Sequence, residues 1–150
     1  MIMRRHADNQ VTQDIWIAFS GVCDVRVLKM LRPGFRHCFA IIRETHWVMI
    51  DPMLHKMDVT TTHLPSGFDF PAWLRSRGYR VVRAPHLSPR RRVCLPSPFT
   101  CVEAMKRLIG LQDWTVLTPW QLYRALLKTP YERERHHGSP VFQTRHAQHV

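Results

Sequence analysis

Two apolar runs joined by a short polar segment constrain the fold of this chain more than any other feature. Residues 35–42 (Phe-Arg-His-Cys-Phe-Ala-Ile-Ile) and 46–51 (His-Trp-Val-Met-Ile-Asp) flank the triplet Arg43-Glu44-Thr45. Short runs that are rich in β-branched and aromatic residues favour β-strands, and a continuous apolar run favours a strand that is buried on both faces. We therefore predict a β-hairpin with a buried body at residues 35–51.

Other segments carry the sequence signals of strands and helices. β-Branched and aromatic content predicts further strands at residues 14–19, 56–61 and 79–84, and a short one at 114–117. Capping residues, prolines near helix starts and terminating glycines predict helices at residues 24–31, 69–78, 101–109 and 118–127. This mixture predicts an α+β fold, in which helices pack against one antiparallel sheet of four to five strands.

The length of the chain fits one domain and a tail. A chain of 150 residues with 45% hydrophobic residues can build a core without metal or disulfide staples. We expect a single α+β domain over residues 1–128. Residues 129–150 are rich in Arg, His, Glu and Gln and have little to bury, so we expect a polar tail there.

The sequence lacks the signals of a membrane protein, a secreted protein or a metal site. No apolar run is long enough to cross a bilayer, and the first residues lack the apolar segment of a signal peptide. We therefore expect synthesis in the cytoplasm, with free thiols at all four cysteines. No Cys-x-x-Cys pair occurs, and we expect no metal or other cofactor.

The charge of the chain points to an acidic partner. Its net charge is +11, which suits nucleic acid, an anionic lipid surface or an acidic protein. The densest basic cluster is Arg90, Arg91 and Arg92, which we take as a candidate DNA contact. The alternative interpretation of this charge is a solvated basic face without a specific partner.

Cys101 occupies a position that suits a nucleophile. Thr100 and Glu103 have the spacing of a capping box, which places Cys101 at the first position of a helix that stops at Gly110. Unpaired backbone N–H groups and the positive end of the helix dipole both favour the thiolate there. The alternative is that Cys101 is a small apolar residue filling a helix start.

The predicted hairpin supplies a candidate base and a candidate orienting group. If its loop has three residues, Ile42 pairs with His46, and His37 falls directly opposite Asp51. A two-residue loop would instead pair His37 with Pro52 and place Asp51 on the other face of the sheet. The proximity of His37 and Asp51 therefore depends on the length of the loop.

Cys101, His37 and Asp51 together form a candidate catalytic set of nucleophile, base and orienter. This arrangement resembles the circularly permuted papain-like hydrolases, including the lecithin:retinol acyltransferase-like group, in which the histidine strand precedes the cysteine helix. The resemblance covers residues 35–110 and implies a thiol hydrolase or acyltransferase that acts on an amide or ester. The third group in the acyltransferase-like members is often a histidine, so His46 competes with Asp51. We prefer Asp51 because His46 lies at the turn end of the hairpin.

A second resemblance concerns short proteins encoded by tailed phages and prophages. It is carried by Arg-Pro-Gly-Phe-Arg-His-Cys, Trp-Val-Met-Ile-Asp-Pro, Thr-Cys-Val-Glu-Ala-Met-Lys-Arg and Thr-Pro-Trp-Gln-Leu-Tyr. It implies a non-catalytic component of a phage particle, in the neck, tail or capsid, built on the same fold. Its partners would be further copies of the chain, neighbouring virion proteins or DNA.

Overall fold

The structure is a computed structural model that describes residues 14–22, 26–53, 55–65, 67–85 and 98–129. Several predictions concern residues outside these ranges and stay predictions. They are the DNA contact at Arg90, Arg91 and Arg92, the polar tail from residue 130 onward, the cap at Asp24, and the free thiols of Cys23 and Cys94.

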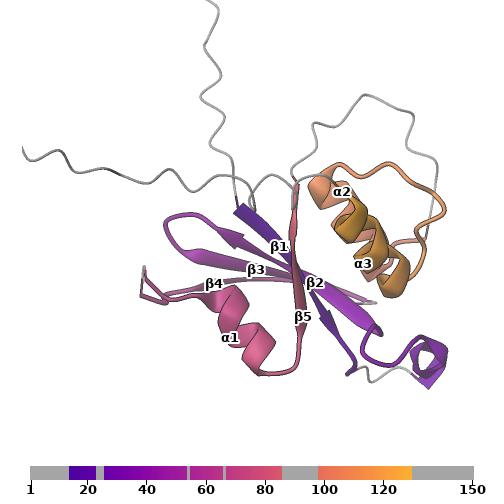
Figure 1. The fold of residues 1–150 in the computed structure, drawn as a ribbon, viewed down its shortest axis with the longest axis horizontal. Helices are drawn as coiled ribbons and strands as arrows, with labels where there is room; N and C mark the ends of the chain where they lie inside the picture. Colours follow the sequence, from indigo (N-terminus) through magenta and orange to yellow (C-terminus); the bar gives the residue numbers. More distant parts are fainter. Residues whose placement is uncertain (1–13, 23–25, 54, 66, 86–97, 130–150) are drawn as a thin grey trace, which may run out of the picture.

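An antiparallel sheet of five strands forms the centre of the fold (Figure 1). The order of the strands across the sheet is β4-β3-β2-β1-β5, and all four neighbouring pairs are antiparallel. The strands are β1 (Asp14–Ser20), β2 (His37–Arg43), β3 (Trp47–Pro52), β4 (Met57–Thr62) and β5 (Arg80–Ala84). The predicted α+β fold with four to five antiparallel strands is therefore confirmed.

Helices cover both faces of this sheet, as Figure 1 shows. α1 (Phe70–Ser76) packs on one face, and α2 (Cys101–Ile109) and α3 (Pro119–Lys128) pack on the other. A short 3-10 helix, η1 (Arg26–Met30), precedes β2 within the segment where a helix over 24–31 was predicted. Among the described residues, no helix has the length and apolar character needed to cross a membrane.

The two helical layers explain the continuous apolar run in β2. Cys38, Ala40 and Ile42 belong to the core beneath α2 and α3, whereas Phe39 and Ile41 belong to the core beneath α1. Successive residues of a strand point to opposite faces, so a strand covered on both sides needs apolar residues at every position. The predicted burial of the hairpin on both faces is confirmed in this strand.

The register of the hairpin differs from the prediction by two residues. Ile42 pairs with Val48 rather than with His46, and the three-residue turn is residues 44–46 rather than 43–45. The physical reason is that Arg43 stays in β2, where it pairs with Asp14 of β1 and its guanidinium lies 5.7 Å from the centre of the Trp47 ring. A shift of two residues keeps each side chain on its predicted face.

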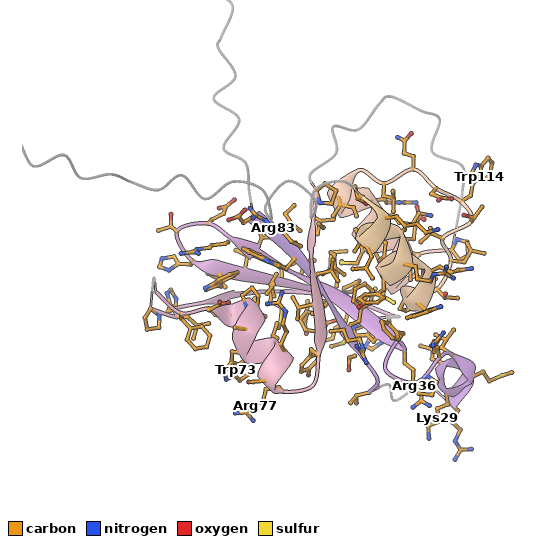
Figure 2. All side chains as sticks on the ribbon, viewed as in Figure 1. Lys29, Arg36, Trp73, Arg77, Arg83 and Trp114 are labelled. Atoms are coloured by element: carbon orange, nitrogen blue, oxygen red, sulfur yellow. The ribbon has the colours of Figure 1, made fainter. Side chains whose placement is uncertain are left out.

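The strand predicted at residues 114–117 is wrong, because these residues form a turn and a loop. Asp113 accepts hydrogen bonds from the backbone N–H of Thr115 at 2.9 Å and from the hydroxyl of Thr115 at 2.6 Å, which stabilises the turn. Trp114 projects into solvent (Figure 2), and only Val116 of this segment is buried. A local side-chain turn therefore outweighs the β propensity of the apolar residues.

Candidate active site

His37 and Asp51 meet where the two strands of the hairpin separate. The β2–β3 pairing ends at Ala40 and Ile50, while β2 continues beside β1 as far as His37. Beyond that point, Nε2 of His37 lies 2.6 Å from Oδ1 of Asp51. Their side chains are 22% and 21% exposed. If the ladder register continued, Asp51 would be diagonal to His37, which is within reach of these side chains.

The helix that carries Cys101 begins as the sequence predicts. The hydroxyl of Thr100 accepts a hydrogen bond from the backbone N–H of Glu103 at 3.2 Å, and Gly110 ends the helix with a left-handed φ of 75°. The second hydrogen bond of a capping box would join the Glu103 carboxylate to the backbone N–H of Thr100. Instead, this carboxylate contacts Lys106 at 3.2 Å and Arg107 at 2.9 Å. The Thr100 cap alone is sufficient to place Cys101 at the first helical position.

The apolar face of α2 fixes Cys101 against the sheet. Val102, Met105 and Ile109 recur at helical spacing and are almost fully buried in the same core as Cys38. Cys101 itself is partly exposed and packs against this core. The helix therefore delivers a partly exposed cysteine to the end of β2 where His37 lies.

The electrostatic environment favours a charged Cys101. Hydrogen bonding with the side chain of Cys38 is the largest influence that lowers the pKa of Cys101, and His37 and the backbone of Cys38 lower it further. These effects outweigh burial and bring the pKa to about 5. Hydrogen bonding with Cys101, together with the contact to Asp51, raises the pKa of His37. The two shifts favour a thiolate–imidazolium pair at neutral pH.

Cys38 is a residue of the site for which the sequence predicts only a free thiol. Its side chain is fully buried beneath α2, and burial raises its pKa well above the ordinary value. Cys38 therefore remains a neutral thiol that can hydrogen-bond the Cys101 thiolate. The alternation of β2 places Cys38 on a defined face, but the sequence alone does not show which face α2 covers.

The competing histidine of the hairpin lies elsewhere. His46 is in the turn between β2 and β3, and its ring stands 5.1 Å from the ring of His63. The residue that contacts His37 is Asp51. Within the described ranges, no group of three or more His, Cys, Asp or Glu side chains could hold a metal ion.

Replacing Asp51 with asparagine should test whether its charge supports His37. Asparagine can still hydrogen-bond the ring but removes the carboxylate that helps to raise the pKa of His37, so that pKa should fall. An NMR titration of the His37 ring measures this change. Loss of a charged hydrogen bond should also slow any reaction that depends on the imidazolium by about 10- to 100-fold.

Asp113→Asn is the matched control for this substitution. Asp113 follows the end of α2 that is opposite Cys101, and its carboxylate accepts hydrogen bonds from the backbone N–H and the hydroxyl of Thr115. Its replacement should leave the titration of His37 unchanged. Equal titration curves for Asp51→Asn and the unmodified protein would contradict the role assigned to Asp51.

Comparison with known proteins adds no family to this description. No protein-family model matches the chain, and no curated protein or solved structure matches it either. What the site can do follows from its own groups. They are a cysteine at a helix start whose pKa is lowered in part by a histidine, and a carboxylate that contacts this histidine.

Proposed function

We propose that this protein is a thiol hydrolase or acyltransferase that acts on an amide or ester. The observation that carries the proposal is the 2.6 Å contact between His37 and Asp51, beside a helix-start cysteine whose pKa is lowered by His37 while it raises the pKa of His37. Nucleophilic acyl transfer requires a nucleophile, a base that acts on it and a carboxylate that orients the base, and Cys101, His37 and Asp51 fit these three roles.

The proposed reaction proceeds through an acyl-enzyme. The Cys101 thiolate attacks the carbonyl carbon, forming a C–S bond and a tetrahedral oxyanion, which backbone N–H groups at the start of α2 stabilise. The intermediate collapses and the bond to the amine or alcohol breaks, while the His37 imidazolium protonates the leaving group. Water or an acceptor alcohol, deprotonated by His37, then attacks the thioester and releases the Cys101 thiolate. Asp51 holds the imidazole in the productive orientation throughout.

We also propose that the fold is a permuted papain-like one. The order along the chain supports this proposal, because the histidine strand β2 and the aspartate strand β3 both precede the cysteine helix α2. The packing supports it as well, since α2 lies on the sheet with Cys101 at the end of β2 that carries His37. The enzyme class and the fold proposal therefore rest on the same three residues.

The experiment that tests the function is identification of the acylated residue. p-Nitrophenyl acetate is the probe, because its activated ester reports acyl transfer without knowledge of the natural substrate. We expect a burst of p-nitrophenol and an acetyl group on Cys101, located by fragmenting the tryptic peptide of residues 93–106. Cys94 lies in the same peptide and is an internal control. An acetyl group spread over several cysteines, or absent from Cys101, would contradict the proposal.

The role in a phage particle stays a prediction from the sequence. It differs from the enzymatic proposal in one testable respect, because a structural component needs no reactive thiol. Particle assembly that is unaffected by loss of Cys101, together with no acylation of Cys101, would favour the structural role.

A further inference from the structure

The site holds a second sulfur that the proposed acyl transfer does not use as a nucleophile. Cys38 is fully buried on β2, on the face covered by α2, and shares its core with Val102 and Met105. Cys101, at the start of α2, packs against that same core and is partly exposed. Cys38 faces the helical layer that includes α2, which begins with Cys101, so a strand and a helix that are distant in sequence bring two thiols together, and each thiol shifts the pKa of the other.

We propose that Cys38 and Cys101 are an oxidative modification site, in which a hydroperoxide oxidises Cys101 and Cys38 then closes a reversible disulfide with it. This site goes beyond acyl transfer and does not depend on it. The disulfide would stop acyl transfer, because Cys101 could not act as the nucleophile until a dithiol reduced the bond.

Both steps balance in atoms and electrons. The Cys101 thiolate attacks the terminal peroxide oxygen, so an S–O bond forms and the O–O bond breaks; the leaving alkoxide, which is hydroxide for hydrogen peroxide, is protonated to an alcohol or water. The sulfur of Cys38 then attacks the sulfenic sulfur of Cys101, so an S–S bond forms and the S–O bond breaks. The departing hydroxide takes the thiol proton of Cys38 and leaves as water. The two thiols lose two electrons in total, and the hydroperoxide gains them.

The environments of the two sulfurs assign them different roles. Cys101 is partly exposed at the start of α2, and its lowered pKa favours the thiolate, which is the form that reacts with peroxide. Cys38 is shielded by the core and its raised pKa keeps it protonated, so peroxide does not attack it first. A neighbouring thiol captures the sulfenic acid before a second peroxide can oxidise it irreversibly.

The test treats the full-length native protein with hydrogen peroxide, alkylates the remaining thiols and digests the protein with trypsin without reductant. Cleavage after Arg36 and Arg43 releases residues 37–43 with Cys38, and cleavage after Arg92 and Lys106 releases residues 93–106 with Cys101. We expect these peptides to be joined, lighter by two hydrogens than their sum, and separated again by dithiothreitol. Because the second peptide also contains Cys94, the experiment is repeated with Cys94→Ser, in which the link should persist.

A Cys38→Ser variant separates the disulfide from other oxidation. In this variant, peroxide should convert Cys101 to sulfinic acid, and dithiothreitol should no longer restore its labelling by iodoacetamide. If the variant does not fold, the peptide link in the unmodified protein still tests whether the disulfide forms. Cys101 recovered as sulfinic acid without a link to residues 37–43, or linked to Cys23 or Cys94 instead, would overturn the proposal. If the disulfide forms but p-nitrophenyl acetate does not acylate Cys101, only the enzymatic proposal is contradicted.

Discussion

A His37→Ala variant should transfer acetyl groups from p-nitrophenyl acetate about 10²- to 10⁴-fold more slowly than the unmodified protein, which is the range that a positioned acid–base group contributes. The variant loses the imidazolium that helps to keep Cys101 ionised and the group that moves protons to and from the leaving group and the attacking water. Stopped-flow measurement of p-nitrophenol release gives the rate of the acylation step.

His46→Ala is the matched control for this prediction. His46 belongs to the same hairpin but lies in its turn, beside His63. A surface substitution away from the site changes the stability by only about 0.5 kcal/mol, so the variant should stay folded. Its acylation rate should therefore remain within about twofold of that of the unmodified protein. Equal losses in the two variants would show that the hairpin matters only for folding and would remove His37 as the base.

Replacement of Phe19 by alanine should produce the largest loss of stability, about 3–5 kcal/mol, because a buried aromatic ring is replaced by a cavity. Phe19 is 1% exposed and lies on β1 opposite Cys38. Its ring packs 5.8 Å from that of Phe35 and 5.4 Å from that of Tyr123 on α3. Chemical denaturation followed by circular dichroism measures the change in the free energy of unfolding.

Trp114→Ala provides the comparison with an exposed aromatic residue. Trp114 is 73% exposed, so its loss should change the free energy of unfolding by about 0.5 kcal/mol or less. A Phe19→Ala variant as stable as Trp114→Ala would contradict the packing of α3 against the sheet.

The parts of the site set by local signals could be predicted from the sequence. Thr100 accepts the backbone hydrogen bond that starts α2, and this local contact is sufficient to place Cys101. The alternation of a strand fixes the faces of His37 and Asp51 relative to each other once the parity of the loop is right. Their contact is present even though the predicted register was two residues off.

The parts set by long-range packing could not be predicted. The turn lies one residue later than predicted because Arg43 stays in β2 and pairs with Asp14 of β1, a strand more than twenty positions away. The role of Cys38 depends on which face of the sheet α2 covers, and no local pattern specifies that choice. The strand predicted around Trp114 was wrong because the side chain of Asp113 stabilises a turn there.

The ionisation of Cys101 is the property on which both the acyl transfer and the oxidation depend. The most direct test is the rate at which iodoacetamide alkylates Cys101 as a function of pH, read from the peptide of residues 93–106 with Cys94→Ser in place. Because only the thiolate reacts, the midpoint of the rate profile reports the pKa of the thiol. The structure predicts a midpoint near pH 5. A midpoint at about pH 8.5, the value of an unperturbed cysteine, would contradict the account.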